Sequence, residues 1–357
     1  VDTLPDPPEL HTSRPPELQS SSPNLSYATT WTEVQGSRLV DVVPVPKPPG
    51  RKDQRGIMSA WNGGAWDSKR NRLIVWGGGH SDGGDNSIYV FDVDDLQWSR
   101  AFTAGSNENG YYASCGANPD LNIPINDTGE PYPDGSPIVY HTYDALVYHP
   151  PSDSLIAFAN KTHHRCGGDL SDGRVHKFNF KTETWTTIYP NGTGGWGTAQ
   201  NASAYDSATD KVWLFGLFGD FVEYDIGSNT KTDRGNYWMT KGVAEIDKKN
   251  SYLIALNDSK NLEARDLITG DTLGTMGVTG WPETMSESPG LVYDTALERL
   301  VMWNGGTSLW SLNTDTAGTA DDPWLWVEHP AMDDTSDNEA GLQAQARGTF
   351  GRFQFSA

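Results

Sequence analysis

Four histidines stand in stretches of the sequence whose residue types could do chemistry. His80 lies in the glycine-rich segment GGGHSDGGDN, His163 and His164 lie in NKTHHRCGGD, and His141 precedes an apolar stretch typical of a strand. Imidazole titrates near neutral pH, so these side chains are candidates for acid–base catalysis. Tyr143 follows His141 by two residues, and residues i and i+2 of a strand share a face. We therefore expect His141 and Tyr143 to point the same way.

These residues belong to a pattern that repeats along the chain. Each copy begins with an apolar strand that ends in an aromatic residue followed by Asp, here called the aromatic step. A polar turn, a second apolar strand, a third strand with aromatic residues and a fourth strand that begins with tryptophan follow. The clearest copy runs from Gly63 to Trp98. Aligned on the aromatic step, the anchors are Trp66, Tyr148, Tyr205, Ile246, Tyr293 and Phe355. The shortest intervals match the ~40–50 residues of one propeller blade.

The repeat predicts an all-β fold, a β-propeller of four-stranded blades. A small sheet with two apolar faces buries both by packing radially against its neighbours. Five copies are complete, residues 348–355 read as the innermost strand of a further blade, and residues 31–34 read as the outer strand that completes it. We expect six blades, with seven as the alternative, and a β-sandwich as the competing fold. The domain spans residues 31–357, after a Pro/Ser-rich extended leader at 1–30.

In a propeller, the loops between second and third strands and the connections into the next inner strand emerge on one face. This places four histidines (His80, His141, His163 and His164) near one mouth of the central channel. Lys241 is the strongest candidate for a cation there, because a buried lysine is rare unless it has a use. The turn aspartates, by contrast, are expected to be solvated. The further binding candidates are Trp61, Asn62, Lys161, Arg165, Gln200, Tyr237, Trp238 and Arg352.

Composition narrows the function class. The formal net charge of the 357 residues is −21, which argues against nucleic acid as a partner because a nucleic-acid binder needs a basic footprint. No apolar run approaches the ~20 residues of a membrane span. The chain starts without a charged and apolar leader, so we expect a signal peptide to have been removed. We predict a secreted monomer.

The two cysteines, Cys115 and Cys166, leave two interpretations open. Their loops are expected on one face, so a disulfide would fix the long insertion that precedes the second inner strand. Alternatively, Cys166 with His163 or His164 could bind zinc, although zinc usually takes four ligands. The sequence slightly favours the disulfide.

The segments GGGHSDGGDNSIYVFD, YHTYDALVYHPPSDSLIAF and GTFGRFQFSA together resemble the Kelch-like propellers that include the secreted ulvan lyases. The resemblance implies β-elimination on a sulfated, uronate-containing polysaccharide. It implies that His141 and either His163 or His164 are catalytic, with Tyr143, Tyr205 or Tyr237 as the tyrosine, although Tyr205 is a blade anchor and fits the core better. His80, at the same mouth, is a further catalytic candidate. Proton transfer would use a His/Tyr pair, with Lys241, Arg165 or Arg352 near the uronate carboxylate. No catalytic cofactor is implied, and the resemblance leaves room for a structural zinc or calcium ion.

Two other functions fit the sequence. Kelch-type propellers often bind carbohydrate or protein without catalysis. Such a protein could use an aromatic mouth for stacking, formed by Trp61, Trp196, Tyr237 and Trp238. A galactose oxidase-like copper enzyme is also a Kelch-type propeller, but it needs two tyrosines, two histidines and a cysteine cross-linked to tyrosine, and no motif here matches that arrangement.

Overall fold

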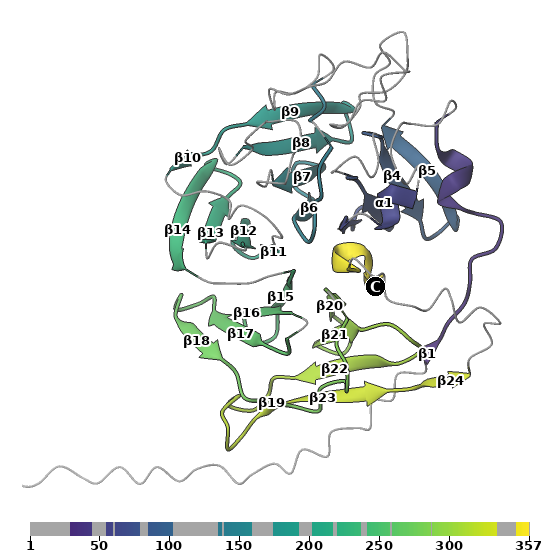
Figure 1. The fold of residues 1–357 in the computed structure, drawn as a ribbon. Helices are drawn as coiled ribbons and strands as arrows, with labels where there is room; N and C mark the ends of the chain where they lie inside the picture. Colours follow the sequence, from purple (N-terminus) through teal and green to yellow (C-terminus); the bar gives the residue numbers. More distant parts are fainter. Residues whose placement is uncertain are drawn as a thin grey trace, which may run out of the picture.

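The protein folds as a β-propeller of five four-stranded blades arranged around a central axis in a computed structural model (Figure 1). The structure describes residues 29–44, 55–59, 61–78, 85–102, 135–137, 139–158, 174–192, 202–216, 220–236, 241–257, 259–286, 288–333 and 348–356. Among these residues, no helix is long and apolar enough to cross a membrane.

Each blade is an antiparallel sheet whose strands follow the chain from the axis outwards. The first blade has β2 (Gly64–Asp67), β3 (Arg72–Val75), β4 (Ile88–Asp92) and β5 (Gln97–Phe102). The second has β6 (Leu146–His149), β7 (Ser154–Phe158), β8 (Val175–Asn179) and β9 (Thr184–Ile188). The third has β11 (Ala202–Asp206), β12 (Lys211–Phe215), β13 (Asp220–Asp225) and β14 (Thr230–Asn236).

The fourth blade has β15 (Val243–Asp247), β16 (Tyr252–Leu256), β17 (Leu262–Asp266) and β18 (Thr272–Thr275). The fifth has β20 (Gly290–Asp294), β21 (Arg299–Trp303), β22 (Leu309–Asn313) and β23 (Trp324–His329). Two short strands extend outer edges in parallel: β10 (Asn191–Gly192) pairs with β14, and β19 (Val278–Thr279) pairs with β23. Outside the blades, the short helices are η1 (Leu39–Val42), α1 (Arg55–Ser59) and η4 (Phe350–Arg352).

The hydrophobic core lies between neighbouring blades. Ile74 and Trp76 of the first blade pack with Phe178 of the second, and similar clusters join the second to the third, the third to the fourth and the fourth to the fifth. A further cluster joins the first blade to α1 and η1 through Ile57 and Tyr89. The blades therefore bury the apolar faces that each small sheet could not bury alone.

The expectation of six or seven blades is wrong, because the C-terminal segment does not form an inner strand. Gly348 and Phe350 have φ of 89° and 51°, and Arg352 Nε and Nη2 donate to the carbonyl oxygens of Thr349 and Gly348. These bonds curl the segment into η4, which contacts both β2 and β20. The first and fifth blades are therefore joined through this turn at the axis (Figure 1).

The predicted outer strand at residues 31–34 is also wrong. The chain instead forms β1 (Thr29–Thr30), which pairs in parallel with β24 (Ala331–Asp333) directly after the fifth blade. Trp31 then donates its indole N–H to the carbonyl oxygen of Thr307, at 2.7 Å, and its ring lies 5.8 Å from that of Trp303. The N-terminal part of the described chain thus packs on the fifth blade.

Candidate functional site

Four inner strands (β2, β6, β15 and β20) are preceded by a residue with the same unusual backbone conformation, and Phe350 in η4 shares it. We call this set the collar: Trp61, Tyr143, Lys241, Ser288 and Phe350, with φ between 47° and 53°. Bulky side chains rarely adopt the left-handed region, and such residues persist only where the surrounding structure holds them. Each of the five stands five residues before an anchor of the repeat, so the collar is a repeated feature.

Hydrogen bonds link the collar from one blade to the next. The Tyr143 N–H donates to the Trp61 carbonyl oxygen at 2.8 Å, and the Ser288 hydroxyl donates to the Lys241 carbonyl oxygen. The Ser288 carbonyl oxygen in turn accepts the N–H of Thr349, next to Phe350, at 2.8 Å. The blades approach closely here, since a Cβ at Gly63 would overlap the carbonyl oxygen of Tyr143. The collar therefore fixes the positions of its side chains around the axis.

His141 and Tyr143 meet in an aromatic cluster at the collar. The His141 ring lies 4.8 Å from the Trp61 ring and 5.8 Å, edge-on, from the Tyr143 ring, and Tyr143 is 5.7 Å from Phe350. The reason differs from the one the sequence suggested, because residues 141–145 are not a strand and β6 begins at Leu146. Only 1% of His141 and 5% of Tyr143 are exposed. The cluster brings a base and a phenol together in a mostly dry environment.

Asn62 and Arg352 bind main-chain carbonyl oxygens beside this cluster. The Asn62 amide nitrogen donates to the carbonyl oxygens of Gly56 and Ile57 in α1, at 3.0 Å each. Arg352 donates to three carbonyl oxygens, including that of Met58 in α1, and burial lowers its pKa to about 10. A guanidinium group held by three carbonyl oxygens is poorly placed to neutralise a uronate. Both residues attach α1 to the axis of the propeller.

Several predicted site residues lie outside the described residues. They are His80, Lys161, His163, His164, Arg165, Gln200, Tyr237 and Trp238, together with Cys115 and Cys166. The disulfide and the zinc site therefore stay predictions. Within the described ranges, no group of three His, Cys, Asp or Glu side chains could hold a metal ion. Of the predicted cations, Lys241 is partly buried at the collar.

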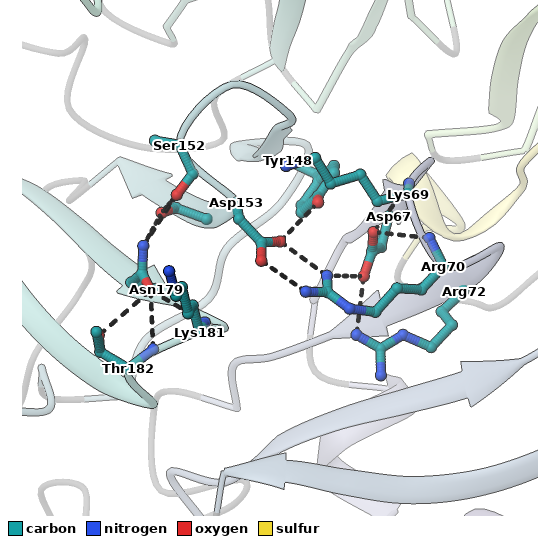
Figure 2. Close-up of polar contacts among 11 residues, drawn as sticks. Asp67, Lys69, Arg70, Arg72, Tyr148, Ser152, Asp153, Asn179, Lys181 and Thr182 are labelled. Atoms are coloured by element: carbon teal, nitrogen blue, oxygen red, sulfur yellow. Dashed lines mark hydrogen bonds and ion pairs between the residues drawn. The ribbon is translucent and has the colours of Figure 1, made fainter.

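The opposite end of the channel, which we call the hairpin end, is formed by the four-residue turns between the first and second strands, at 68–71, 150–153, 207–210, 248–251 and 295–298. Arg70 makes a bidentate pair with Asp153 of the next blade, at 2.7 and 2.6 Å, and also contacts Asp67 at 3.0 Å (Figure 2). Arg70 lowers the pKa of Asp153 to about 2. The contact repeats one blade on, where His149 Nε2 lies 2.7 Å from Asp210.

The expectation that the turn aspartates are solvated is confirmed for Asp94 and Asp95, which are exposed in the turn after β4, but it is wrong for the aspartates that end the inner strands. Asp67 has no exposed surface, and it accepts the main-chain N–H groups of Lys69 and Arg70. Asp247 and Asp294 are buried and accept main-chain N–H groups in the same way. These aspartates satisfy the donors that a tight turn leaves unpaired.

Two carboxyl groups inside the channel were missed by sequence analysis. Asp144 Oδ2 accepts the N–H of Ala244 at 3.0 Å, and Glu245 Oε1 accepts the N–H of Ile246 at 2.7 Å. Burial raises the pKa of Asp144 well above its usual range, and it also raises the pKa of Glu245. The available signal was one acidic residue inside each of two inner apolar stretches, directly after Tyr143 and Ala244.

Comparison with known proteins assigns no family and no function to the chain. No protein-family model matches the chain, and no curated protein matches it. Among solved structures, it is similar to a structural genomics protein of unknown function from Bacteroides thetaiotaomicron VPI-5482, at 9% identity and a TM-score of 0.39. The match covers 68% of this chain and 53% of that chain, so the present chain spans about half of its neighbour's length. The strand order of the five sheets, and not this match, defines the class of protein as a five-bladed β-propeller.

Proposed function

We propose that the protein is a secreted, Kelch-like polysaccharide lyase that cleaves a uronate-containing, sulfated polysaccharide at the collar. The observation that carries this proposal is the contact of His141 with both Trp61 and Tyr143. These residues precede the first strands of two different blades. Together they supply a base, a phenol and an aromatic ring on which a sugar can stack.

The reaction is a β-elimination. His141 takes the proton from C5 of the uronate, the C4–O bond breaks as a C4–C5 double bond forms, and Tyr143 gives its proton to the departing glycosidic oxygen. Charge on the carboxylate increases as the C5 proton leaves, and a nearby cation stabilises it. We assign this role to Lys241, because the guanidinium group of Arg352 is bound to main-chain carbonyl oxygens. This β-elimination requires no cofactor. The proposed substrate is an extracellular polysaccharide, which is why we propose a secreted enzyme.

The test is a screen of ulvan, glucuronan, alginate, pectate and glycosaminoglycans for the ultraviolet absorbance of an unsaturated product. His141→Ala and Tyr143→Phe are each expected to reduce kcat/KM by about 10²–10⁴-fold. His329→Ala is the matched control, because His329 is also buried but lies on β23, where its Nε2 contacts the Ser311 hydroxyl. Normal cleavage by His141→Ala would sink the assignment.

A second function, a carbohydrate-binding propeller without catalysis, is favoured by one observation. His141 and Tyr143 are almost fully buried, so in this conformation they support the collar more than they face solvent. A binding protein would retain acidic polysaccharide on an affinity gel and release no unsaturated product. That outcome in the same screen would replace the lyase by the binding function.

A further inference from the structure

The channel contains a cavity of about 600 Å³ that is separate from the collar. The first strand of every blade and residues of the C-terminal segment line it, and the turn residues Ser68, Lys248 and Thr295 place its mouth at the hairpin end. At its inner end, the lining residues Asp144 and Gly351 follow directly on Tyr143 and Phe350, whose buried rings pack together. Its volume lies in the range of about 300–1,000 Å³ typical of small-molecule sites.

The cavity wall is rich in main-chain hydrogen-bonding groups. The strands β2, β6, β11, β15 and β20 are each the inner edge of their sheet, and an edge strand directs N–H and C=O groups away from the sheet. Asp144 and Glu245 bond some of these groups, and the Ser203 hydroxyl donates to the Asp144 carbonyl oxygen at 2.6 Å. Side-chain hydroxyl and amide groups of Ser68, Thr295 and Gln354 add to the lining. A ligand with many hydroxyl groups matches this wall.

Aromatic anchors of the blades surround the same space. Trp66, Tyr205 and Tyr293 all line the cavity, and Trp66 and Tyr205 are partly exposed. Sugar rings pack their C–H faces on such side chains. The alternation of aromatic faces and polar groups therefore fits a saccharide better than an apolar ligand.

Charge selects among saccharides. Asp144 and Glu245 lie in the lining, and the burial that disfavours their charged forms would equally disfavour a uronate carboxylate placed beside them. A cationic ligand would meet the Lys248 ammonium group, which already lies over the Tyr293 ring at 5.7 Å. The lining therefore disfavours ligands of either charge.

We propose that this cavity is a second binding site, which takes one small neutral sugar through the hairpin end. The collar was assigned an anionic polymer, whereas this site is assigned a neutral monosaccharide, and the two assignments rest on different residues. The propeller then binds saccharides at both ends of its axis.

The experiment titrates D-glucose, D-galactose, D-xylose and L-rhamnose into the full chain, followed by saturation-transfer NMR and calorimetry. At least one sugar is expected to bind saturably, with one site per chain. Thr295→Trp places a large side chain at the mouth and is expected to weaken binding by about tenfold or more. Ser68→Trp, at the same turn position of the first blade, provides a second variant should the first not fold.

Ser207→Trp is the matched control. Ser207 follows Asp206 as Thr295 follows Asp294, and it is exposed, but it does not line the cavity. It is expected to bind sugar as the unmodified protein does. No saturable binding of any of the four sugars, unchanged binding by Thr295→Trp, or equally tight binding of D-glucuronate would each overturn the proposal.

The collar variants separate the two proposals. His141→Ala should keep its affinity for the neutral sugar, and Thr295→Trp should keep any polysaccharide cleavage. A loss of neutral-sugar binding in His141→Ala would place that sugar at the collar and refute the second site. Absence of cleavage by the unmodified protein would refute the lyase and leave the cavity unaffected.

Discussion

The two ends of the propeller axis are built by different means. At the hairpin end, side chains make the contacts between blades, as Arg70 does with Asp153 (Figure 2). His149 makes such a contact with Asp210. At the collar, the main chain makes the contacts between blades, because the carbonyl oxygen of one collar residue accepts an N–H or hydroxyl group from the next blade or from the C-terminal turn. Both ends repeat around the axis, and both hold residues with a positive φ, since the last residue of each hairpin turn, such as Asn71, is also left-handed. Of the two ends, only the collar has aromatic residues such as Trp61 and Tyr143 in that conformation.

Because of this difference, we expect the two ends to tolerate substitutions differently. Side-chain contacts at a partly exposed end are screened by solvent and can be exchanged one at a time. Main-chain contacts at a closely packed end depend on aromatic residues keeping a left-handed conformation, which costs them more than it costs the Asn and Asp of the hairpin turns. A fixed geometry is what a site for chemistry requires, whereas an open end with exchangeable turns suits the entry of a small ligand.

The largest effect is expected from removing the ring that closes the collar. Phe350 has no exposed surface and packs on Tyr143, so Phe350→Ala should destabilise the protein by about 3–5 kcal/mol. The midpoint of urea unfolding measures the change. Tyr189→Ala, which removes a ring that is 54% exposed, is the control and should shift the midpoint far less. Equal midpoints for the two variants would mean that the collar does not hold the blades together.

A smaller effect is expected at the hairpin end. Arg70→Met removes the bidentate pair with Asp153 from a partly exposed site, and it should cost about 1–2 kcal/mol at neutral pH. The pKa of Asp153 is lowered to about 2 in the folded protein, so the contribution of the pair is complete above the unfolded pKa of about 4. It should disappear as the pH falls through 2.

Urea unfolding of the unmodified protein and of Arg70→Met between pH 7 and 2 checks this expectation. Arg38→Met, which removes an exposed ion pair with Asp41, should change nothing measurable. A difference between Arg70→Met and the unmodified protein that stays constant down to pH 2 would contradict the role of the Asp153 carboxylate.

The repeat in the sequence predicted the four-stranded blades, but it did not predict how the ring of blades closes. The aromatic anchors such as Tyr148 and Tyr293 are read from local composition, and counting back from them finds the collar residues that share a positive φ. The segment GTFGRFQF alternates like a strand, but whether it extends depends on distant carbonyl oxygens, including that of Met58, that Arg352 reaches. Local pattern cannot report such a contact, and the blade count was wrong for that reason.

The candidate site shows the same limit. The sequence placed His141 near Tyr143 by assuming a strand, and the rings meet although the backbone there is not extended. The turn aspartates were expected in water because aspartate is usually exposed, whereas the tight turn at Asp67 requires a buried acceptor. Asp144 and Glu245 share the channel only because the blades close into a ring, and the local sequence pattern does not reveal such neighbours.

The smallest change in stability is expected from a substitution inside the channel. The direction in which this change depends on pH distinguishes the channel from the hairpin end. Burial raises the pKa of Glu245 in the folded protein, so the folded state favours the protonated carboxyl. The cost of ionising it is absent below the unfolded pKa of about 4.3 and grows as the pH rises toward the folded pKa. Glu245→Gln does not titrate and should escape that cost.

The Tm of Glu245→Gln should therefore equal that of the unmodified protein in acid and exceed it at pH 8, by less than the decrease caused by Arg70→Met. Calorimetric scans from pH 4 to 8 measure the difference, and Glu298→Gln, which changes an exposed turn carboxylate, should show no such trend. The pH dependence is opposite to that at Asp153, because burial disfavours the charged form at Glu245 while Arg70 favours it at Asp153. A variant less stable at pH 8 than the unmodified protein would show that the ionised Glu245 holds its neighbours together, and that the channel, like the hairpin end, depends on charge.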